Sequence, residues 1–174
     1  MKKSFMKRLV ALALVIVSVF SISAVAFAAA PLYGDCNYDE YINVRDAASS
    51  GGARIYKLRN GEPVTPTGTT KNGYTQISSP VNGWVMTSWL TSETPGWMTL
   101  YGTKTMNLAT HDQMKAFQQD LSKIDGVNAI DDDGVWGPET QTAVEQLQRK
   151  AGIKVDGIAG TYTKLWCYNL ARAN

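Results

Sequence analysis

Histidine and cysteine are scarce in this sequence. Its 174 residues contain one histidine, His111, and two cysteines, Cys36 and Cys167. A zinc site built from several histidines is excluded, and a Ser-His-Asp triad could use only His111. The acidic run at residues 131–133 lacks the alternate spacing and the closing glutamate of a calcium loop. We therefore expect no catalytic residues, no metal site and no cofactor.

Extended runs of one charge are also lacking. The chain has 17 basic and 15 acidic residues, a net charge of +2. Four of the basic residues fall within residues 1–28, which contain no acidic residue, so the remainder is slightly acidic and its charges alternate in sign. No basic stripe is left to neutralise phosphates, which excludes nucleic acid as the expected partner.

Residues 1–28 read as a secretory signal peptide. Lys2, Lys3, Lys7 and Arg8 form a basic start, an apolar run follows from Leu9 to Phe20, and small residues lead to an Ala26-Phe27-Ala28 cleavage site. The alternative is an uncleaved anchor, because residues 9–30 are just long enough to span a bilayer. We expect cleavage, a secreted protein, and no membrane contact afterwards.

Residues 36–93 have the pattern of a small all-β unit. Five β-prone pieces, "YINVR", "ARIYKL", "PVTPTG", "YTQIS" and "GWVMT", are separated by turn residues. Asn-Gly pairs at residues 60–61, 72–73 and 82–83 tolerate the positive φ angles of tight hairpins. Five short strands bury a core by curling, so we expect a small barrel.

Residues 108–174 change to helical spacing. Apolar residues recur at intervals of three and four around Phe117, Leu147 and Leu165, which predicts three amphipathic helices. Helices this short need mutual packing, so a three-helix bundle follows. Residues 94–107 are then a linker, although Trp97 and Tyr101 make it too apolar to be fully solvated.

The helical half contains the same turn motif twice. "DGVWGPET" from Asp133 and "DGIAGTYT" from Asp156 share the pattern D-G-x-x-G-x-x-T. Pro138 suits the first position of a helix, and the preceding aspartate is expected to accept hydrogen bonds from free backbone N–H groups at the helix start. The repeat therefore predicts two loop-to-helix joints.

Residues 132–166 resemble the type 1 peptidoglycan-binding domain. The motif D-G-x-[aromatic]-G-x-x-T-x-x-A-V-x-x-[apolar]-Q, followed by a second D-G-x-x-G-x-x-T, carries the resemblance. It implies a three-helix domain that binds bacterial cell-wall peptidoglycan. The loop "KIDGVNAIDDDG" departs from the shorter turn usual in that family.

Residues 41–90 resemble the bacterial SH3 domain. The opening "NVRDAAS", the "LRNG" turn and the closing "GWVMTSWL" carry this resemblance through their order and spacing. It implies a small β-barrel that attaches secreted proteins to cell-wall peptide or glycan. The expected fold class is thus two small domains, an all-β SH3-like barrel followed by an all-α three-helix bundle.

Aromatic residues are the favoured ligand contacts, because flat rings with polar tips suit sugars and stem peptides. Trp84 and Trp166 are expected in the cores, whereas Trp136 can face either the bundle or a groove. The candidate ligand-binding residues are Tyr41, Tyr74, Trp89, Asp133, Trp136 and Thr140.

The resemblances predict a secreted, non-catalytic protein of the cell wall whose two tethered modules bind peptidoglycan, through its glycan strand or its stem peptide. One alternative is an accessory or truncated form of a peptidoglycan hydrolase. Another is a wall-anchored adaptor that holds a secreted cell-wall enzyme.

The two cysteines leave a further choice open. In an exported protein, an even cysteine count favours a disulfide. A bridge between Cys36 and Cys167 would lock the modules side by side. The alternative is a buried Cys167 and a free Cys36.

Overall fold

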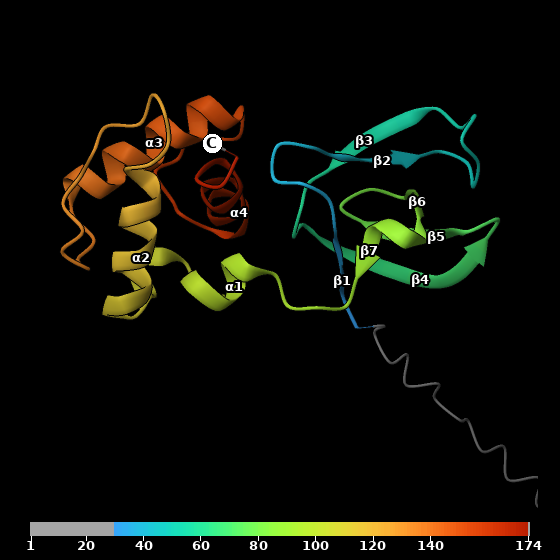
Figure 1. The fold of residues 1–174 in the computed structure, drawn as a ribbon, viewed down its shortest axis with the longest axis horizontal. Helices are drawn as coiled ribbons and strands as arrows, with labels where there is room; N and C mark the ends of the chain where they lie inside the picture. Colours follow the sequence, from blue (N-terminus) through green and yellow to red (C-terminus); the bar gives the residue numbers. More distant parts are fainter. Residues whose placement is uncertain (1–29, 174) are drawn as a thin grey trace, which may run out of the picture.

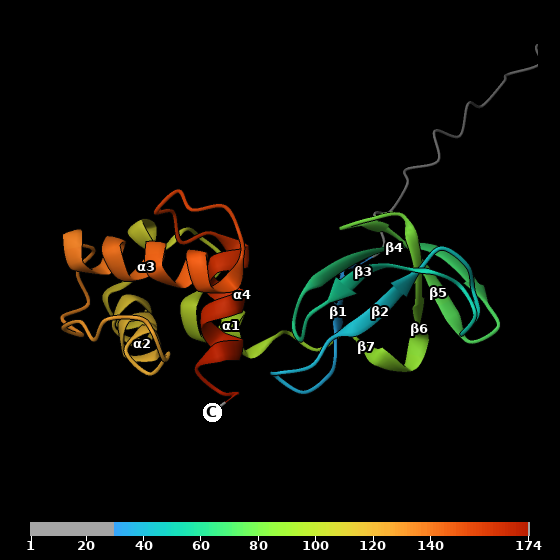
Figure 2. The same ribbon diagram turned by 90° about the horizontal axis from the view of Figure 1, so that it is seen from above.

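A computed structural model describes residues 30–173 of the chain. The predicted signal peptide lies outside the described residues. The remainder forms a β-sheet unit and a helical unit that lie side by side, with α1 and α4 nearest the sheet (Figure 1). The chain crosses between the units in the segment between β7 and α1 (Figure 2).

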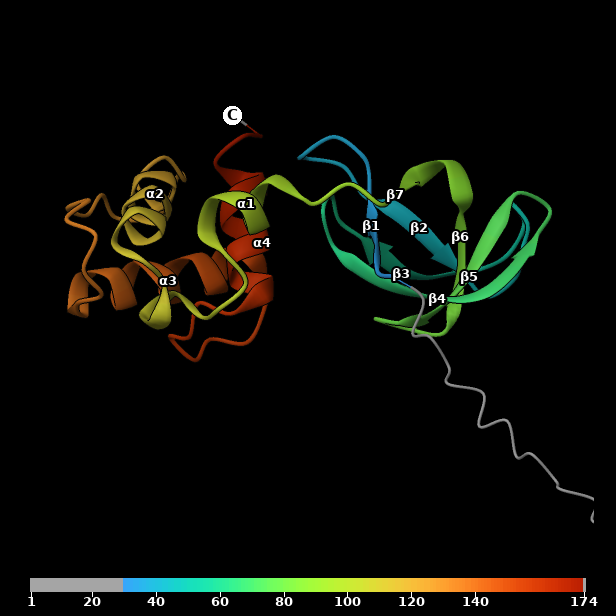
Figure 3. The same cartoon turned by 90° about the horizontal axis from the view of Figure 1, so that it is seen from below.

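One curved antiparallel sheet makes up the first unit (Figure 3). Its strands are β1 (Leu32–Gly34), β2 (Ile42–Arg45), β3 (Arg54–Leu58), β4 (Pro63–Lys71), β5 (Tyr74–Ser79), β6 (Gly83–Met86) and β7 (Leu90–Thr91). They are ordered β3-β2-β6-β5-β4-β1-β7. The edge strands β3 and β7 do not pair with each other, so the sheet is not closed and the predicted barrel is not confirmed.

The five predicted strands correspond to β2 to β6. Alternation buries Ile42 and Val44 of β2, and these residues pack with Leu58, Ile77 and Val85 in the core under the sheet. The sequence did not predict β1 and β7, which have three and two residues. Strands this short carry too little pattern to be recognised, although they extend the sheet beyond β4.

The Asn-Gly pairs have different roles. Asn72 and Gly73 have φ angles of 52° and 78° and form the two-residue turn between β4 and β5, as predicted. Asn60 and Gly61 instead join β3 to β4, which are not neighbours in the sheet. This turn reaches the helical unit.

Four α-helices form the second unit, where three were predicted. They are α1 (Gly96–Tyr101), α2 (His111–Leu121), α3 (Pro138–Ala151) and α4 (Thr161–Leu170). The extra helix, α1, lies in the predicted linker at residues 94–107. Its Trp97 and Tyr101 belong to the helical core, and the Tyr101 ring meets the Phe117 ring edge-on at 5.3 Å between centroids. The predicted linker is therefore partly structural.

None of the helices within residues 30–173 has the length and apolar character needed to cross a bilayer.

The two units contact each other through the turn between β3 and β4. The Trp97 indole N–H donates to the Gly61 carbonyl at 3.0 Å, and the Asn169 amide donates to the Asn60 carbonyl at the same distance. Trp97 and Asn169 are each 2 % exposed, so these hydrogen bonds are shielded from water. They fix the turn against α1 and α4.

The two cysteines are free thiols in the structure, which agrees with the second of the two alternatives that the sequence left open. Cys167 lies on the buried side of α4, with its Sγ atom 3.9 Å from the Tyr101 hydroxyl. Cys36 packs on the separate core of the sheet. Each thiol faces the interior of its own unit, and this separates the two sulfur atoms.

Thiol labelling checks this arrangement. Burial raises the pKa of Cys36 to about 11 from an ordinary value of 9.0, and burial also raises the pKa of Cys167. Because the thiolate is the reactive species, alkylation of Cys36 at pH 8 should be about 100-fold slower than that of an ordinary thiol, and Cys167 should react more slowly still. Intact mass after timed alkylation measures both rates.

The control is the same reaction in denaturant without reductant. Two labels should then be taken up quickly. Failure to label the unfolded chain before reduction would show a disulfide and contradict the structure.

Candidate functional site

Gln118 organises the first copy of the repeated turn. Its side chain is 1 % exposed and enters the loop between α2 and α3. The amide nitrogen lies 3.0 Å from Asp133 Oδ1, from the Val135 carbonyl and from Thr140 Oγ1. The amide oxygen accepts from the Gly134 N–H at 2.8 Å. The amide of one buried side chain thus bonds both acceptor groups and a backbone N–H donor of the loop.

Gln148 repeats this arrangement one helix later. Its amide nitrogen donates to Asp156, to the Ile158 carbonyl and to Thr163 at 3.0 to 3.2 Å. Its amide oxygen accepts from the backbone N–H groups of Asp156 and Gly157, both at 3.0 Å. The helical unit is therefore built from two equivalent helix–loop–helix joints that share α3.

The two aspartates do not cap the helices, contrary to the sequence prediction. Glycines, Gly137 and Gly160, occupy the N-cap positions, and neither helix start has a side-chain cap hydrogen bond. Asp133 instead accepts from the Val135 N–H at 2.9 Å, and Asp156 accepts from the Ile158 N–H at the same distance. The carboxylates stabilise the loops, five residues before the helices begin.

Glycine follows each aspartate for a structural reason. Gly134 has a φ of 72°, and a Cβ atom there would lie 2.4 Å from the His111 ring. Gly157 has a φ of 68°. Residues with side chains rarely adopt this left-handed conformation, so the D-G pair is needed for the shape of each loop.

Thr140 is part of the interior. It is 2 % exposed, and its hydroxyl faces the Gln118 amide. This buried position does not leave Thr140 free to contact a ligand, as the sequence prediction required. Asp133 is exposed, but its carboxylate is occupied by the loop.

Trp136 borders a groove between the two repeated loops. The groove has a volume of about 420 Å³ and is lined by Thr105, Asn107, Trp136, Gln141 and residues 156–159. The Trp136 ring is half-buried and packs on the helical core, while its other side faces the groove. It therefore serves both alternatives left open by the sequence, core and surface.

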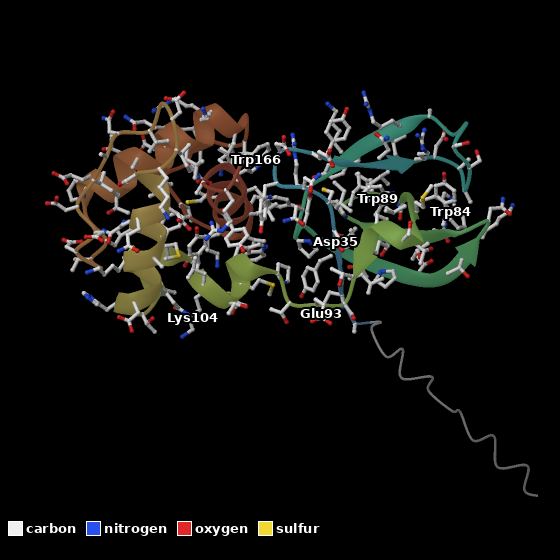
Figure 4. All side chains as sticks on the ribbon, viewed as in Figure 1. Asp35, Trp84, Trp89, Glu93, Lys104 and Trp166 are labelled. Atoms are coloured by element: carbon white, nitrogen blue, oxygen red, sulfur yellow. The ribbon has the colours of Figure 1, made fainter. Side chains whose placement is uncertain are left out.

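The three aromatic candidates of the sheet unit come together. Tyr41, Tyr74 and Trp89 line a pocket of about 200 Å³ with Met86 and Arg45 among its other walls. Tyr41 and Trp89 are 38 % and 43 % exposed, whereas Tyr74 is 6 % exposed and forms the floor. Trp84 and Trp89 both lie on the sheet unit, away from the helices (Figure 4).

Cations surround the Tyr41 ring. The Lys57 ammonium lies 4.2 Å from its centroid, and the guanidinium groups of Arg54 and Arg59 lie at 5.7 and 5.8 Å. These groups stabilise the ring through cation–π attraction and make this edge of the sheet basic. The pocket thus combines aromatic surface with positive charge.

The roles of Gln118 and Gln148 were not predicted from the sequence. A signal was present, because "MKAFQ" at residues 114–118 and "VEQLQ" at residues 144–148 share an apolar-x-x-apolar-Gln pattern before each D-G loop. Polar residues at the buried edge of a helix need partners, which the adjacent loop supplies.

No group of three or more histidine, cysteine, aspartate or glutamate side chains with metal-binding geometry occurs in residues 30–173. Asp132 accepts a hydrogen bond from Gln119 at 2.6 Å, and Asp133 is held by its loop.

Comparison with known proteins finds a similarity in the helical unit. Residues 110–164 match the family model "Putative peptidoglycan binding domain", and this range contains α2, α3, both repeated loops and the start of α4. No curated protein and no solved structure matches the chain. The helical unit is thus similar to a peptidoglycan-binding domain, which suggests peptidoglycan binding. The resemblance of residues 41–90 to a bacterial SH3 domain stays a prediction.

The buried amide of Gln118 predicts a large effect on stability. Gln118→Ala leaves the Gly134 N–H and the Thr140 hydroxyl without their partner, which should lower the free energy of unfolding by about 2–4 kcal/mol. The matched control is Gln119→Ala, an exposed neighbour, which should change it by less than about 0.5 kcal/mol. Urea unfolding followed by tryptophan fluorescence measures both. Equal effects of the two variants would contradict the role of Gln118.

The two loop aspartates predict a loss of stability in acid. Backbone N–H donors, Val135 for Asp133 and Ile158 for Asp156, lower the pKa of each carboxyl below its usual value, and the neighbouring glutamine amides add to this. A lowered folded-state pKa gives stability that is present above the unfolded value of 3.8 and is lost as pH falls through the folded value.

Unfolding by urea at pH 6 and pH 2.5 tests this expectation. Asp156→Asn keeps an Oδ1 acceptor but cannot titrate, so its stability should fall less between the two pH values than that of the wild type. The control is an Asp131→Asn variant, which replaces an exposed carboxylate that precedes the first repeated turn and is not part of it. An unchanged pH dependence in Asp156→Asn would rule out the proposed linkage.

Proposed function

We propose that this protein is a secreted, non-catalytic protein of the bacterial cell wall that binds peptidoglycan through two tethered units. The observation that carries the proposal is the family match over residues 110–164, together with the groove that the matched motif itself builds. Export is expected from the signal peptide at residues 1–28 and would place the protein at the wall.

The groove of the helical unit is the first proposed contact. Trp136 comes from the first repeated loop, and residues 156–159 of the second line the same groove with the exposed polar side chains Asn107 and Gln141. An aromatic face beside polar side chains suits the apolar face and the hydroxyl or amide groups of a sugar or a stem peptide. Because the buried glutamines fix both loops, the groove is formed before a ligand arrives.

The aromatic pocket of the sheet unit is the second proposed contact. Support comes from the convergence of Tyr41, Tyr74 and Trp89 and from the resemblance to the bacterial SH3 domain. Each contact alone is small, but tethering makes the second one intramolecular, which raises the overall affinity by about 100-fold or more when both sites are reached together.

Sedimentation with purified cell-wall sacculi tests the proposal. The protein without residues 1–28 should sediment with sacculi, and Trp136→Ala or Trp89→Ala should each weaken binding by about tenfold, since buried aromatic contacts dominate such interfaces. The double variant should bind more weakly than either single one. Failure of the wild-type protein to sediment would refute peptidoglycan binding.

Two controls separate folding from binding. Val135→Ala changes an exposed side chain beside Trp136 that does not line the groove, so binding should stay within about twofold of wild type. If Trp136→Ala lowers the melting temperature, Asn107→Ala changes the same groove at an exposed position. Full binding by both groove variants would exclude the groove as the contact.

A further inference from the structure

A cleft of about 630 Å³ lies between the sheet unit and the helical unit, and it shares the loop residues Asp156 and Ile158 with the groove beside Trp136. Its sheet side includes Tyr56, Lys57 and Arg59, and its helical side includes Lys154, Tyr162 and Trp166. Trp166 lies on the side of α4 that faces the sheet (Figure 4). The cleft exists because the hydrogen bonds of Asn60 and Gly61 hold the two units together.

Arg59 presents an unused positive charge to this cleft. Its guanidinium carbon lies 4.5 Å from the Trp166 ring centroid, so the flat group stacks on the indole. No carboxylate of the described residues forms an ion pair with it within 4.0 Å. Its backbone N–H donates to Glu62 at 2.9 Å, which fixes the base of the side chain. One guanidinium N–H donates to the Glu40 carbonyl at 3.4 Å, and the remaining N–H donors, held beside the Trp166 ring, can bind an anion.

The acidic residues of the cleft do not neutralise this charge at the surface. Glu62 is 1 % exposed, and its two oxygens accept from the Tyr56 hydroxyl at 2.6 Å and from the Arg59 N–H. Burial raises the pKa of Glu62, although its hydrogen bonds and Arg59 oppose the shift. Asp156 is held in its loop and lies 3.4 Å from the Lys154 ammonium. Lys57 adds a second cation to the sheet side.

Apolar surface accompanies the charge. Tyr162 is 45 % exposed and Ile158 is 56 % exposed, and both border the cleft with Ile153. A ligand that fits this lining has a carboxylate for the guanidinium and small aliphatic groups for the aromatic and isoleucine side chains. A short peptide of small residues with free carboxylates has both, whereas a neutral sugar chain lacks the charge.

We propose that this cleft binds the stem peptide of peptidoglycan, with a peptide carboxylate on the guanidinium of Arg59 and the peptide lying against Tyr162. The inference rests on the proposed function and adds to it the part of the polymer that is recognised. The cleft is formed by both units, so the peptide is bound only when the two units are in contact.

Calorimetry with a soluble stem tetrapeptide tests the proposal on the protein without residues 1–28. The wild type should bind, and Arg59→Gln should weaken binding by at least tenfold. The matched control is Arg149→Gln, an exposed arginine on α3 that lines neither the cleft nor the other two sites, which should bind within twofold of wild type. Equal loss in both variants, or no binding by the wild type, would overturn the proposal.

A second variant guards against a loss of docking. If Arg59→Gln lowers the melting temperature, Tyr162→Ala changes an exposed residue and should still weaken tetrapeptide binding by about tenfold. Higher salt should weaken binding by the wild type more than binding by Arg59→Gln, because a charge pair is screened. A wild-type salt dependence equal to that of Arg59→Gln would contradict the carboxylate contact.

Three preparations of sacculi separate this inference from the proposed function. Untreated sacculi test the function itself. Sacculi stripped of stem peptides by an amidase should bind less protein, and sacculi stripped of teichoic acid should bind as before. If the protein sedimented equally with untreated and with peptide-free sacculi, the proposed peptidoglycan binding would stand and the stem peptide would be rejected as the ligand of the cleft. Loss of binding on removal of teichoic acid would assign the cleft to phosphate and also reject it.

Discussion

Most of the candidate binding surface depends on the hydrogen bonds made by the buried side chain of Gln148. It fixes the loop from Asp156 to Gly160 through hydrogen bonds to both backbone and side-chain groups. That loop forms one wall of the groove beside Trp136 and also part of the cleft beside Tyr162. A buried amide with all its partners present stabilises a single loop conformation, whereas one that loses them is costly. The same residue therefore determines the shape of two surfaces that lie on either side of one loop.

The helical unit shows how a short repeat can build a domain without a large core. In each joint, a glutamine from the preceding helix, an aspartate in the loop and a threonine in the next helix meet at the same point. The polar groups freed by an irregular loop are thereby satisfied without water. The apolar residues of α1, α2, α3 and α4 then need only to fill the space between joints, and Tyr101, Phe117 and Leu147 do so with no exposed surface.

Much of the fold could be predicted from the sequence, because periodicity and turn residues are local signals. They located five of the strands and the three longer helices, and the aromatic candidates of the sheet unit did converge on one pocket. The errors concern partners distant in sequence. Asp133 was predicted to be a helix cap, whereas its partner Gln118 lies 15 residues earlier and gives no local sign of the contact. Thr140 was predicted to bind ligand, whereas the same glutamine holds it inside. Likewise α1 depends on Phe117 and the sheet for its burial, and the pairing of β1 with β4 and β7 has no local sign.

The hydrogen bonds from α1 and α4 to the turn at Asn60 and Gly61 are accepted by its carbonyl oxygens and not by its side chains. A main-chain acceptor is present whatever residue occupies the position, provided that the turn keeps its shape. Substitutions on the flanking strands can then alter the charge and size of the cleft wall without weakening the joint. These hydrogen bonds thus separate docking from recognition, so that this architecture can acquire a new ligand preference at an exposed position such as Lys57 while the relative placement of its two halves is inherited unchanged.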